Sequence, residues 1–387
     1  MDTRRTASNK PKRLRAVVVG GSLGGLCAGL TLRCIGYAVD IFEKSSSALQ
    51  DRGAGLVVQT ELLQYLEQHN IATREAISVP SRFRQYLAQD GSLLHGEASF
   101  QLMTAWNTVF RQLREAFPDE QYHQGHKLTG FEQDEHEVIA RFENGREEPC
   151  DVLVGADGID SAVRHQLLPD VIPQYAGYVA WRGVVEEDAV PSAVADVFAE
   201  KFTFFQMPHS HILCYLVPGA GGELAVGKRR LNWVWYWNVP QGEPLHALLT
   251  DTAGQLHHYS VPPGAVSKDL LLEQQAVATQ LLPEVFQHLV RATAEPFIQP
   301  IYDLASPRMV FGRVCVLGDA AFVPRPHTAA STAKAVTNAI ALAETLQVHY
   351  GDVVTAFKAW ESSQLQLGNY LKRLGMSLGN RSQFGRP

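Results

Sequence analysis

The sequence has few cysteines, a modest share of charged residues and no long apolar run. Its five cysteines, among 387 residues, form neither a CxxC pair nor a cluster at zinc-ligand spacing. This argues against a disulfide framework and against a metal site, and it favours a reducing compartment. No apolar stretch approaches the roughly 18 to 20 residues that span a bilayer. We therefore expect a cytoplasmic protein with no membrane span and no bound metal.

Positive charge is also in short supply. Lys and Arg total 34 against 40 Asp and Glu, so the formal net charge is −6, and nucleic acid is not an expected partner. The length predicts two or three domains, and the 45% share of hydrophobic residues is typical of globular proteins. The basic N-terminus leaves two interpretations open, a transit peptide or a flexible basic tail over residues 1–14.

What the sequence does contain begins with a βαβ pattern. Residues 16–19 form an apolar run bounded by a glycine, as expected of a buried parallel strand. The following turn aligns with GxGxxG as Gly20, Ser22 and Gly25, with serine at the second glycine position. Glu43 lies 23 residues after Gly20, close to the spacing of a ribose-binding acid. This context favours dinucleotide binding over an ordinary glycine-rich turn.

The middle of the chain reads as a second lobe. Asp-Gly and Asn-Gly pairs indicate tight hairpins, and short strand candidates follow at residues 179–185, 201–207, 212–217, 223–227 and 232–239. Residues 269–290 read as helical, and a buried strand returns at 313–319. The pattern predicts an α/β fold in which a Rossmann-like domain is interrupted by a mostly antiparallel sheet domain. The expected Rossmann-like segments are 15–80, 100–175 and 291–387, and the expected sheet segments are 81–99 and 176–290.

Two further motifs follow strands, Gly155-Ala156-Asp157-Gly158 and Gly318-Asp319-Ala320-Ala321. Together with the first loop, their order resembles the FAD-dependent single-component aromatic hydroxylases, the p-hydroxybenzoate hydroxylase superfamily. They match its GxGxxG, DG and GD motifs over nearly the whole chain. The GGS form of the first loop, the GYVAWRG segment at 177–183, the NWVWY segment at 232–236 and RPHTAA at 325–330 resemble its 2,6-dihydroxypyridine 3-hydroxylase branch.

The resemblance implies a set of FAD-binding residues. Glu43 would hold the adenosine ribose, Asp319 the ribityl chain, and Asp157 would lie near the pyrophosphate and shape the DG turn. Arg111 would reach FAD phosphates or ribityl hydroxyls, and its alternative is an ordinary exposed helix arginine. Ala329 and Ser331 stand where the family has glycines. The expected cofactor residues are Gly20, Ser22, Leu23, Gly25, Glu43, Lys44, Gly53, Arg111, Leu128, Asp157, Asp319, Ala330, Ser331 and Thr332.

The resemblance also implies a reaction. NADH or NADPH would reduce FAD, O2 would add at flavin C4a, and the hydroperoxide would hydroxylate a small electron-rich aromatic such as a hydroxypyridine or phenol. Two alternatives stay open: a flavin dehydrogenase or oxidase on the same fold, and a flavin-binding protein without turnover. The oligomeric state is open as well, with a homodimer as one alternative.

Three residues are candidates for the substrate site. His211 and Tyr215 are four residues apart, which places both on one face of a strand. Either could act as base or hydrogen-bond partner for a substrate hydroxyl, and the alternative is a surface histidine and a core tyrosine. His327 follows the GD motif and is expected near the flavin by resemblance, although a structural role is the alternative.

The tryptophans at 233, 235 and 237 alternate onto one face of their expected strand. Packing in the sheet core is the favoured interpretation, and a stacking wall for the substrate is the alternative.

Overall fold

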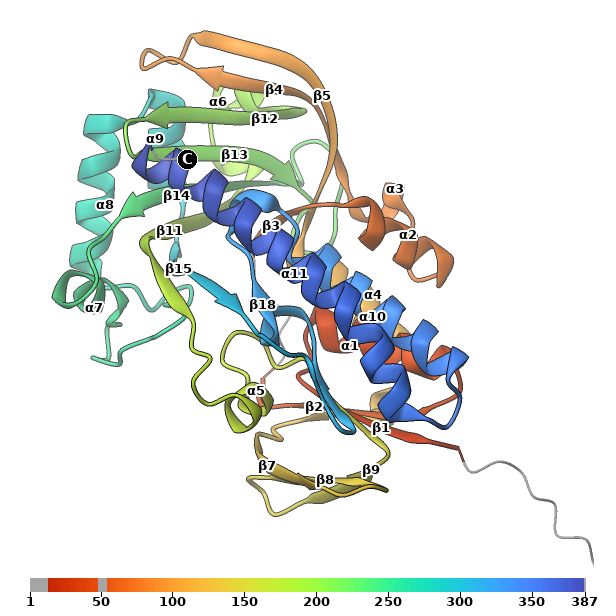
Figure 1. Ribbon diagram of the computed structural model, residues 1–387. Coiled ribbons are helices and arrows are strands. Elements are labelled where there is room, and N and C mark those ends of the chain that lie inside the picture. Colours follow the sequence, from red (N-terminus) through yellow and green to blue (C-terminus); the bar gives the residue numbers. More distant parts are fainter. Residues whose placement is uncertain (1–12, 48–53, 386–387) are drawn as a thin grey trace, which may run out of the picture.

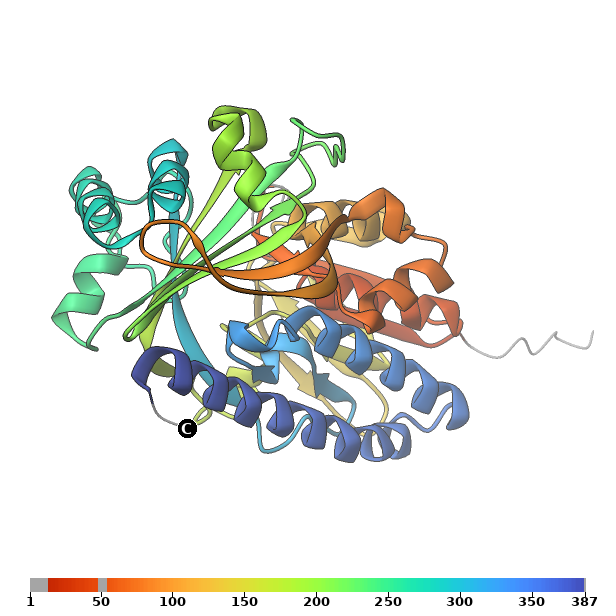
Figure 2. The same cartoon turned by 90° about the horizontal axis from the view of Figure 1, so that it is seen from above.

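A six-stranded sheet, built from strands near both ends of the chain, forms the first lobe. The computed structural model describes residues 13–47 and 54–385 (Figures 1 and 2). All neighbours in this sheet are parallel except β16 and β17. In spatial order its strands are β16 (Val310–Phe311), β17 (Val314–Val316), β10 (Val152–Gly155), β1 (Arg15–Val19), β2 (Ala38–Glu43) and β6 (Tyr122–Gln124). The central strands are buried on both faces, as their continuous apolar runs predict.

Helices and a small sheet cover this parallel sheet. α1 (Leu23–Cys34) packs on α10 (Ser331–Val348) and on α4 (Trp106–Ala116). Gly29 lets α1 lie close to the sheet, because a Cβ there would lie 2.8 Å from the Cδ1 of Ile41 on β2. The small sheet is antiparallel and lies at the lower end in Figure 1. Its strands are β7 (Leu128–Gln133), β8 (Val138–Phe142) and β9 (Glu147–Cys150), and α5 (Ala162–Leu167) contacts β7.

A nine-stranded sheet forms the second lobe. Its neighbours are antiparallel except for the parallel pair β12 and β4. In spatial order its strands are β18 (Phe322–Val323), β15 (Phe297–Ala305), β11 (Gln174–Glu186), β14 (Arg230–Asn238), β13 (Ser210–Val217), β12 (Lys201–Met207), β4 (Val79–Leu87), β5 (Leu93–Ala105) and β3 (Gly55–Val57).

The two faces of this sheet have different roles. One face packs against helices and contains Trp181, Trp233 and Trp235, together with Phe286 from a helix. Figure 2 shows these helices on the side of the sheet away from the parallel-sheet lobe. They are α6 (Ser192–Phe198), α7 (Glu243–Leu249), α8 (Lys268–Leu281) and α9 (Glu284–Ala292). Because side chains alternate along a strand, the intervening residues face the parallel-sheet lobe instead.

The C-terminal helix joins the two lobes. α11 (Val353–Phe384) packs on α10 in the first lobe and reaches β13, β14 and β15 in the second. Figure 1 shows it crossing the molecule as one diagonal blue helix. The shorter helices α2 (Thr60–Gln68) and α3 (Arg74–Ile77) lead from β3 to β4, and α2 contacts α10. Within the described residues, no helix is long and apolar enough to cross a membrane.

The expected fold class is confirmed, with local corrections. The strand expected at 223–227 is wrong, because these residues form turns between β13 and β14. The helix expected at 269–290 is two helices, since Pro283 begins a second one. The division into two domains stays a prediction, and the second sheet extends past its proposed limits into β3, β15 and β18. Arg13 donates hydrogen bonds to the carbonyls of Gly36 and Tyr37, so it belongs to the fold rather than to a free tail.

Candidate active site

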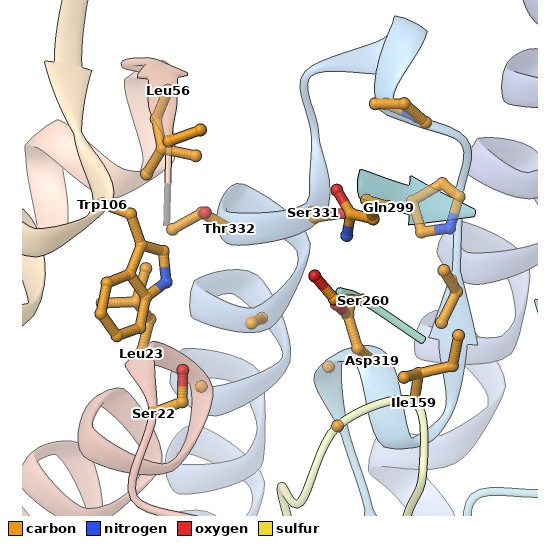
Figure 3. A pocket seen from close by; sticks show the side chains of 18 of the residues that line it. Ser22, Leu23, Leu56, Trp106, Ile159, Ser260, Gln299, Asp319, Ser331 and Thr332 are labelled. Carbon is orange, nitrogen blue, oxygen red and sulfur yellow. The ribbon is translucent and has the colours of Figure 1, made fainter. Parts of the chain in front are cut away.

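A cavity of about 1050 Å³ lies between the parallel sheet and the nine-stranded sheet (Figure 3). This exceeds the roughly 300 to 1,000 Å³ of a site for one small ligand. Most of the expected site residues line it, from both lobes. They are Gly20, Ser22, Leu23, Glu43, Lys44, Leu128, Asp157, His211, Tyr215, Asp319, His327, Ala330, Ser331 and Thr332. The cavity therefore brings the three sequence motifs and the strand residues together.

The first loop is shaped by backbone contact that only glycine permits. Gly20 has φ +102°, and a Cβ there would lie 2.4 Å from the carbonyl oxygen of Ala156. A Cβ on Gly25 would lie 1.8 Å from the carbonyl oxygen of Gly20. Gly25 thus supports the loop from beneath and is not among the residues that line the cavity.

The N-terminus of α1 opens into the cavity. Ser22 is its N-cap residue but makes no side-chain capping hydrogen bond, and the first turn carries no acid. Figure 3 shows Ser22 and Leu23 at this helix start. The first backbone N–H groups of a helix have no partner within it, and they carry partial positive charge. This end of α1 is therefore suited to an anion.

Glu43 closes the same loop from the end of β2. Its Oε2 accepts the N–H of Gly21 and its Oε1 accepts the N–H of Ser45, each at 2.8 Å. The side chain is buried yet lines the cavity, so its position is fixed from two sides. Lys44 points to Asp160, with 3.8 Å between Nζ and Oδ2, and both side chains are about half exposed, so this pair stabilises the fold little.

The DG turn is held by its own side chains. Asp157 Oδ1 accepts the hydroxyl of Ser161 at 2.5 Å, and its Oδ2 accepts the N–H of Val163 at 3.3 Å. Burial raises the pKa of Asp157, and the hydrogen bond from Ser161 opposes that shift. The buried guanidinium of Arg164 donates to the carbonyls of Ile159 and Ala320. Arg164 thereby connects the DG turn to the GD motif, a role that its place in the motif did not reveal.

Asp319 has a buried partner that the sequence analysis missed. Lys334 Nζ lies 2.7 Å from Asp319 Oδ1, and it also donates to the carbonyl of Phe322. The Lys334 side chain is 1% exposed, whereas that of Asp319 is 44% exposed. Burial lowers the pKa of Lys334, and the Asp319 carboxylate opposes that shift. A lysine within the small and apolar residues that begin α10 was the available signal.

The N-terminus of α10 also faces the cavity without a side-chain cap. Ser331 and Thr332 begin it, and Figure 3 shows Thr332 on the side of Trp106 and Ser331 on the side of Gln299. Ala329, just before it, has φ +51° and ψ 20°. This left-handed conformation costs an alanine about 1 to 2 kcal/mol relative to the ordinary helical region, and it fits the expectation that glycine is more usual at this position.

His211 and Tyr215 line the end of the cavity that the nine-stranded sheet forms, called the sheet end below. Both lie on β13 and face the cavity, as their spacing predicts. His211 Nδ1 lies 2.7 Å from Ser382 Oγ and 3.2 Å from Gln383 Nε2. These partners come from the last turn of α11, which sequence reasoning did not connect to the site. Burial lowers the pKa of His211 to about 4 and raises the pKa of Tyr215. Near neutral pH both groups are therefore uncharged.

His327 joins this group from the segment after the GD motif. Its Nε2 lies 2.9 Å from the hydroxyl of Tyr178, and its ring lies 4.8 Å from that of Tyr236 and 5.6 Å from that of His211. Burial lowers its pKa to about 3, and the charges of His211, Arg325 and Arg182 add to the shift. Tyr178 and Tyr236 were missed, because strand register, not sequence spacing, brings them here.

Three further expectations concern the tryptophans, Arg111 and Gly53. Trp233 and Trp235 pack in the sheet core, where their indole N–H groups donate to Thr293 Oγ1 and Ser210 Oγ, so the core-packing interpretation is confirmed. Arg111 donates to the carbonyl of Gly221 at 2.9 Å and is not among the lining residues; its contact with FAD stays a prediction. Gly53 lies outside the described residues.

Comparisons with known proteins identify the family. The model for an FAD binding domain-like family matches residues 175–303. The 2,6-dihydroxypyridine 3-monooxygenase of Paenarthrobacter nicotinovorans is 37% identical over 377 residues, covering 97% of this chain and 93% of that protein. The chain belongs to the FAD-dependent aromatic hydroxylases. The predicted superfamily and its branch are thereby confirmed.

Other relatives of this hydroxylase agree. The 6-hydroxynicotinate 3-monooxygenase of Pseudomonas fluorescens is 27% identical, with 93% of this chain and 90% of that protein covered. The structure of 2,6-dihydroxypyridine-3-hydroxylase from Arthrobacter nicotinovorans matches with a TM-score of 0.92 and 36% identity, over 98% of this chain and 95% of that one. The chain is an FAD-dependent monooxygenase of this family, whose members use NADH or NADPH as reductant.

The cofactor end of the cavity fits FAD. Two uncapped helix N-termini face one cavity, which suits a ligand with anionic groups at two places. Gly20 lets the first loop lie directly against the backbone of Ala156 and Asp157, which brings the loop and the DG turn together at this end of the cavity. Bound FAD would carry electrons from the nicotinamide to O2 and activate it, and the oxygen atom that enters the substrate would come from O2.

Proposed function

We propose that this hydroxylase acts on a small hydroxypyridine, with a simple phenol as the second candidate. The observation that carries the proposal is the composition of the sheet end of the cavity. Its walls are aromatic and aliphatic side chains, Phe202, Phe204, Leu213 and Val234 among them, with a few hydrogen-bonding groups placed between. Such a site orients a flat ring through a small number of polar contacts. The relatives named for hydroxypyridines support the same substrate class.

We assign FAD to the other end of the cavity. Glu43 would accept the adenosine ribose hydroxyls, the N–H groups at the start of α1 would bind the pyrophosphate, and Asp319 would accept the ribityl hydroxyls. The N–H groups at the start of α10 would face the pyrimidine ring. The ion pair with the buried Lys334 fixes the partly exposed Asp319 before the cofactor arrives, so little ordering is required on binding.

His211 is proposed to position the substrate hydroxyl. Its Nδ1 is occupied by Ser382 and Gln383, so Nε2 is the ring nitrogen left for a ligand. With a pKa of about 4, His211 is a weak base near neutral pH and serves first as a hydrogen-bond partner. Tyr215 stands on the same face of β13, where its hydroxyl can share that task.

The test is a screen of the FAD-loaded protein. 2,6-Dihydroxypyridine, 6-hydroxynicotinate and simple phenols are added with NADH or NADPH, and O2 uptake, peroxide and hydroxylated product are measured. We expect a hydroxypyridine to stimulate nicotinamide oxidation most and to yield about one hydroxylated product per nicotinamide. Stoichiometric peroxide without product would indicate an oxidase, and no oxidation with any ring would indicate a flavoprotein without this activity.

A variant then tests the assigned residue. His211→Ala should keep FAD bound but lose coupling, because the ring is no longer oriented and more of the O2 consumed leaves as peroxide. His246→Ala is the matched control, since this exposed histidine lies on α7 away from the cavity. Normal coupling in His211→Ala would remove His211 from the site.

Two further expectations remain predictions. A homodimer would show as twice the 42.7 kDa chain mass in solution, which sedimentation equilibrium measures directly. The cytoplasmic location is tested by fractionating cells of the source.

A further inference from the structure

One arginine at the sheet end of the cavity, Arg182, has a buried Nε without a hydrogen-bond partner among the described residues. Arg182 lies on β11 and lines the cavity. Among the described residues, no ion pair involves Arg182 either. The residue as a whole is partly buried, and a cation partly withdrawn from water without a counter-charge loses solvation. Its position therefore calls for an anion that the described residues do not supply.

Strand register places Arg182 in an otherwise apolar row. It lies opposite Val234 on β14 and Phe297 on β15. The row continues through Leu213 on β13 to Phe204 on β12. All four neighbours line the cavity, and none of them offers a hydrogen-bond acceptor in its side chain. Arg182 is thus the charged residue in a row of cavity-lining side chains that are otherwise apolar.

The groups around Arg182 are neutral at ordinary pH. Tyr236 lies on the neighbouring strand β14, Tyr215 and His211 lie on the next strand, β13, and His327 lines the same cavity from the segment before α10. Burial raises the pKa of these two tyrosines and lowers that of His327, and the smaller effect of the Arg182 charge lowers all three pKa values. The carboxylates that line the cavity are Glu43, Asp157, Asp160 and Asp319, and none of them belongs to the nine-stranded sheet.

We propose that Arg182 binds the ionised ring oxygen of the substrate, so that the site selects the anion of an acidic hydroxyarene. This inference rests on the proposed function, and it adds the charge state that the site recognises. An ionised oxygen donates more electron density to the ring than a hydroxyl does, which makes the ring more reactive toward an electrophilic oxygen. His211 and Tyr215 would then orient the ring, and Arg182 would hold its charge.

A second arginine in the cavity provides the matched control. Arg84 lies on β4, four strands away from β11, which is roughly 19 Å along the sheet. Its Nε is also buried without a partner among the described residues, but its guanidinium lies over the rings of Phe202 and Phe204 at 5.5 and 5.6 Å. Its Nη2 also donates to Gln101 at 3.5 Å, whereas Arg182 has neither kind of contact within the described part of the chain. Arg84→Gln and Arg182→Gln therefore remove the same charge from opposite sides of one cavity.

The experiment measures binding to the oxidised, FAD-loaded enzyme without nicotinamide, so that no turnover is required. 2,6-Dihydroxypyridine and 2,6-dimethoxypyridine are titrated by their effect on flavin absorbance. We expect the dihydroxy ring to bind wild type and to bind Arg182→Gln about tenfold to a hundredfold more weakly. Arg182→Lys should recover part of the loss. Arg84→Gln should change binding less than threefold, and the dimethoxy ring should bind weakly whichever arginine is changed.

A second probe separates this proposal from the proposed function. 4-Nitrophenol reports its own ionisation by colour, and we expect wild type, but not Arg182→Gln, to lower its apparent pKa on binding. If the pyridine fails to bind but 4-nitrophenol ionises through Arg182, the hydroxypyridine function is wrong and the anion site stands. If both rings bind wild type and Arg182→Gln equally, or neither ring binds, the anion site is wrong. Loss of FAD from Arg182→Gln, or an equal effect of Arg84→Gln, would overturn it too.

Discussion

The two ends of the cavity are built from different materials. The cofactor end consists of backbone: glycine turns, uncapped helix N-termini and a carboxylate, Glu43, held by two N–H groups. The sheet end consists of side chains from strands far apart in sequence, with partners from the last turn of α11. Backbone sites tolerate little change at the loop and recognise charge in general. Side-chain sites can be altered one residue at a time, and this is where we propose that substrate choice resides.

The largest effect on FAD binding is expected from a substitution in the backbone of the cofactor end, and two adjacent glycines provide the test and its control. In Gly25→Ala the new Cβ would lie 1.8 Å from the carbonyl oxygen of Gly20, whereas in Gly24→Ala it would meet the Cβ of Ala335 at 3.5 Å, an ordinary contact. We expect Gly25→Ala to weaken FAD binding at least about a hundredfold, since the loop must move, and Gly24→Ala to bind FAD normally. Titration of the FAD-free proteins with FAD checks this. Equal binding by both variants would show that backbone contact does not define the cofactor end.

The same contrast explains what could be predicted from the sequence. The first loop, Glu43 and the two aspartate motifs are short contiguous patterns, so their meeting at the carboxyl edge of a parallel sheet follows from the fold class. The roles of Lys334 and Arg164 were not predicted, because their partners in the GD motif lie 15 and 156 residues away in the sequence.

At the sheet end, the sequence predicts which residues of one strand share a face, but not which residues of other strands lie next to them. His211 and Tyr215 share a face by spacing alone, but register decides that Arg182 and Tyr236 stand beside them. The contact of Ser382 with His211 spans 171 residues and depends on where a long helix ends. The prediction of a strand at 223–227 is wrong, because this short apolar segment lies within a glycine-rich connection and pairs with no strand of the described chain.

Removing Asp319 tests whether the cofactor end depends on one side chain as well as on backbone. Asp319→Ala should weaken FAD binding about tenfold to a hundredfold. It should also lower the free energy of unfolding by roughly 1 to 3 kcal/mol, because Lys334 keeps a buried charge, a value discounted for the partial exposure of Asp319. Asp319→Ala with Lys334→Met should restore the stability but not the FAD affinity. Unchanged FAD affinity in Asp319→Ala would refute the ribityl assignment.

The sheet end should reveal itself through pH. Burial lowers the pKa of His211 from 6.5 to about 4 and that of His327 to about 3, so below pH 6.5 the unfolded chain binds protons that the folded chain does not. Stability is therefore lost as pH falls from 6.5 toward 4, by roughly 2 kcal/mol per histidine at pH 5. Urea unfolding at pH 7.5 and 5.0 should show this drop reduced by about that amount in His211→Gln and His327→Gln. An identical drop in both variants and in His246→Gln would place the acid sensitivity elsewhere.

The smallest expected effect concerns Ala329, where the two ends of the cavity meet. With φ +51° it occupies a conformation that glycine adopts without strain, whereas its neighbour Ala330 has φ −105°. Ala329→Gly should therefore raise the free energy of unfolding by about 0.5 to 1 kcal/mol. Ala330→Gly should not raise it, because glycine increases the entropy of the unfolded chain and no backbone strain is relieved at this position. Thermal unfolding with and without FAD measures both variants. If Ala329→Gly is stabilised only in the FAD-free protein, the strain is relieved when the cofactor binds, and the start of α10 adapts to FAD. Equal stabilisation with and without FAD means that the α10 end is preformed, as the uncapped start of α1 is expected to be, and that the whole cofactor end is rigid backbone.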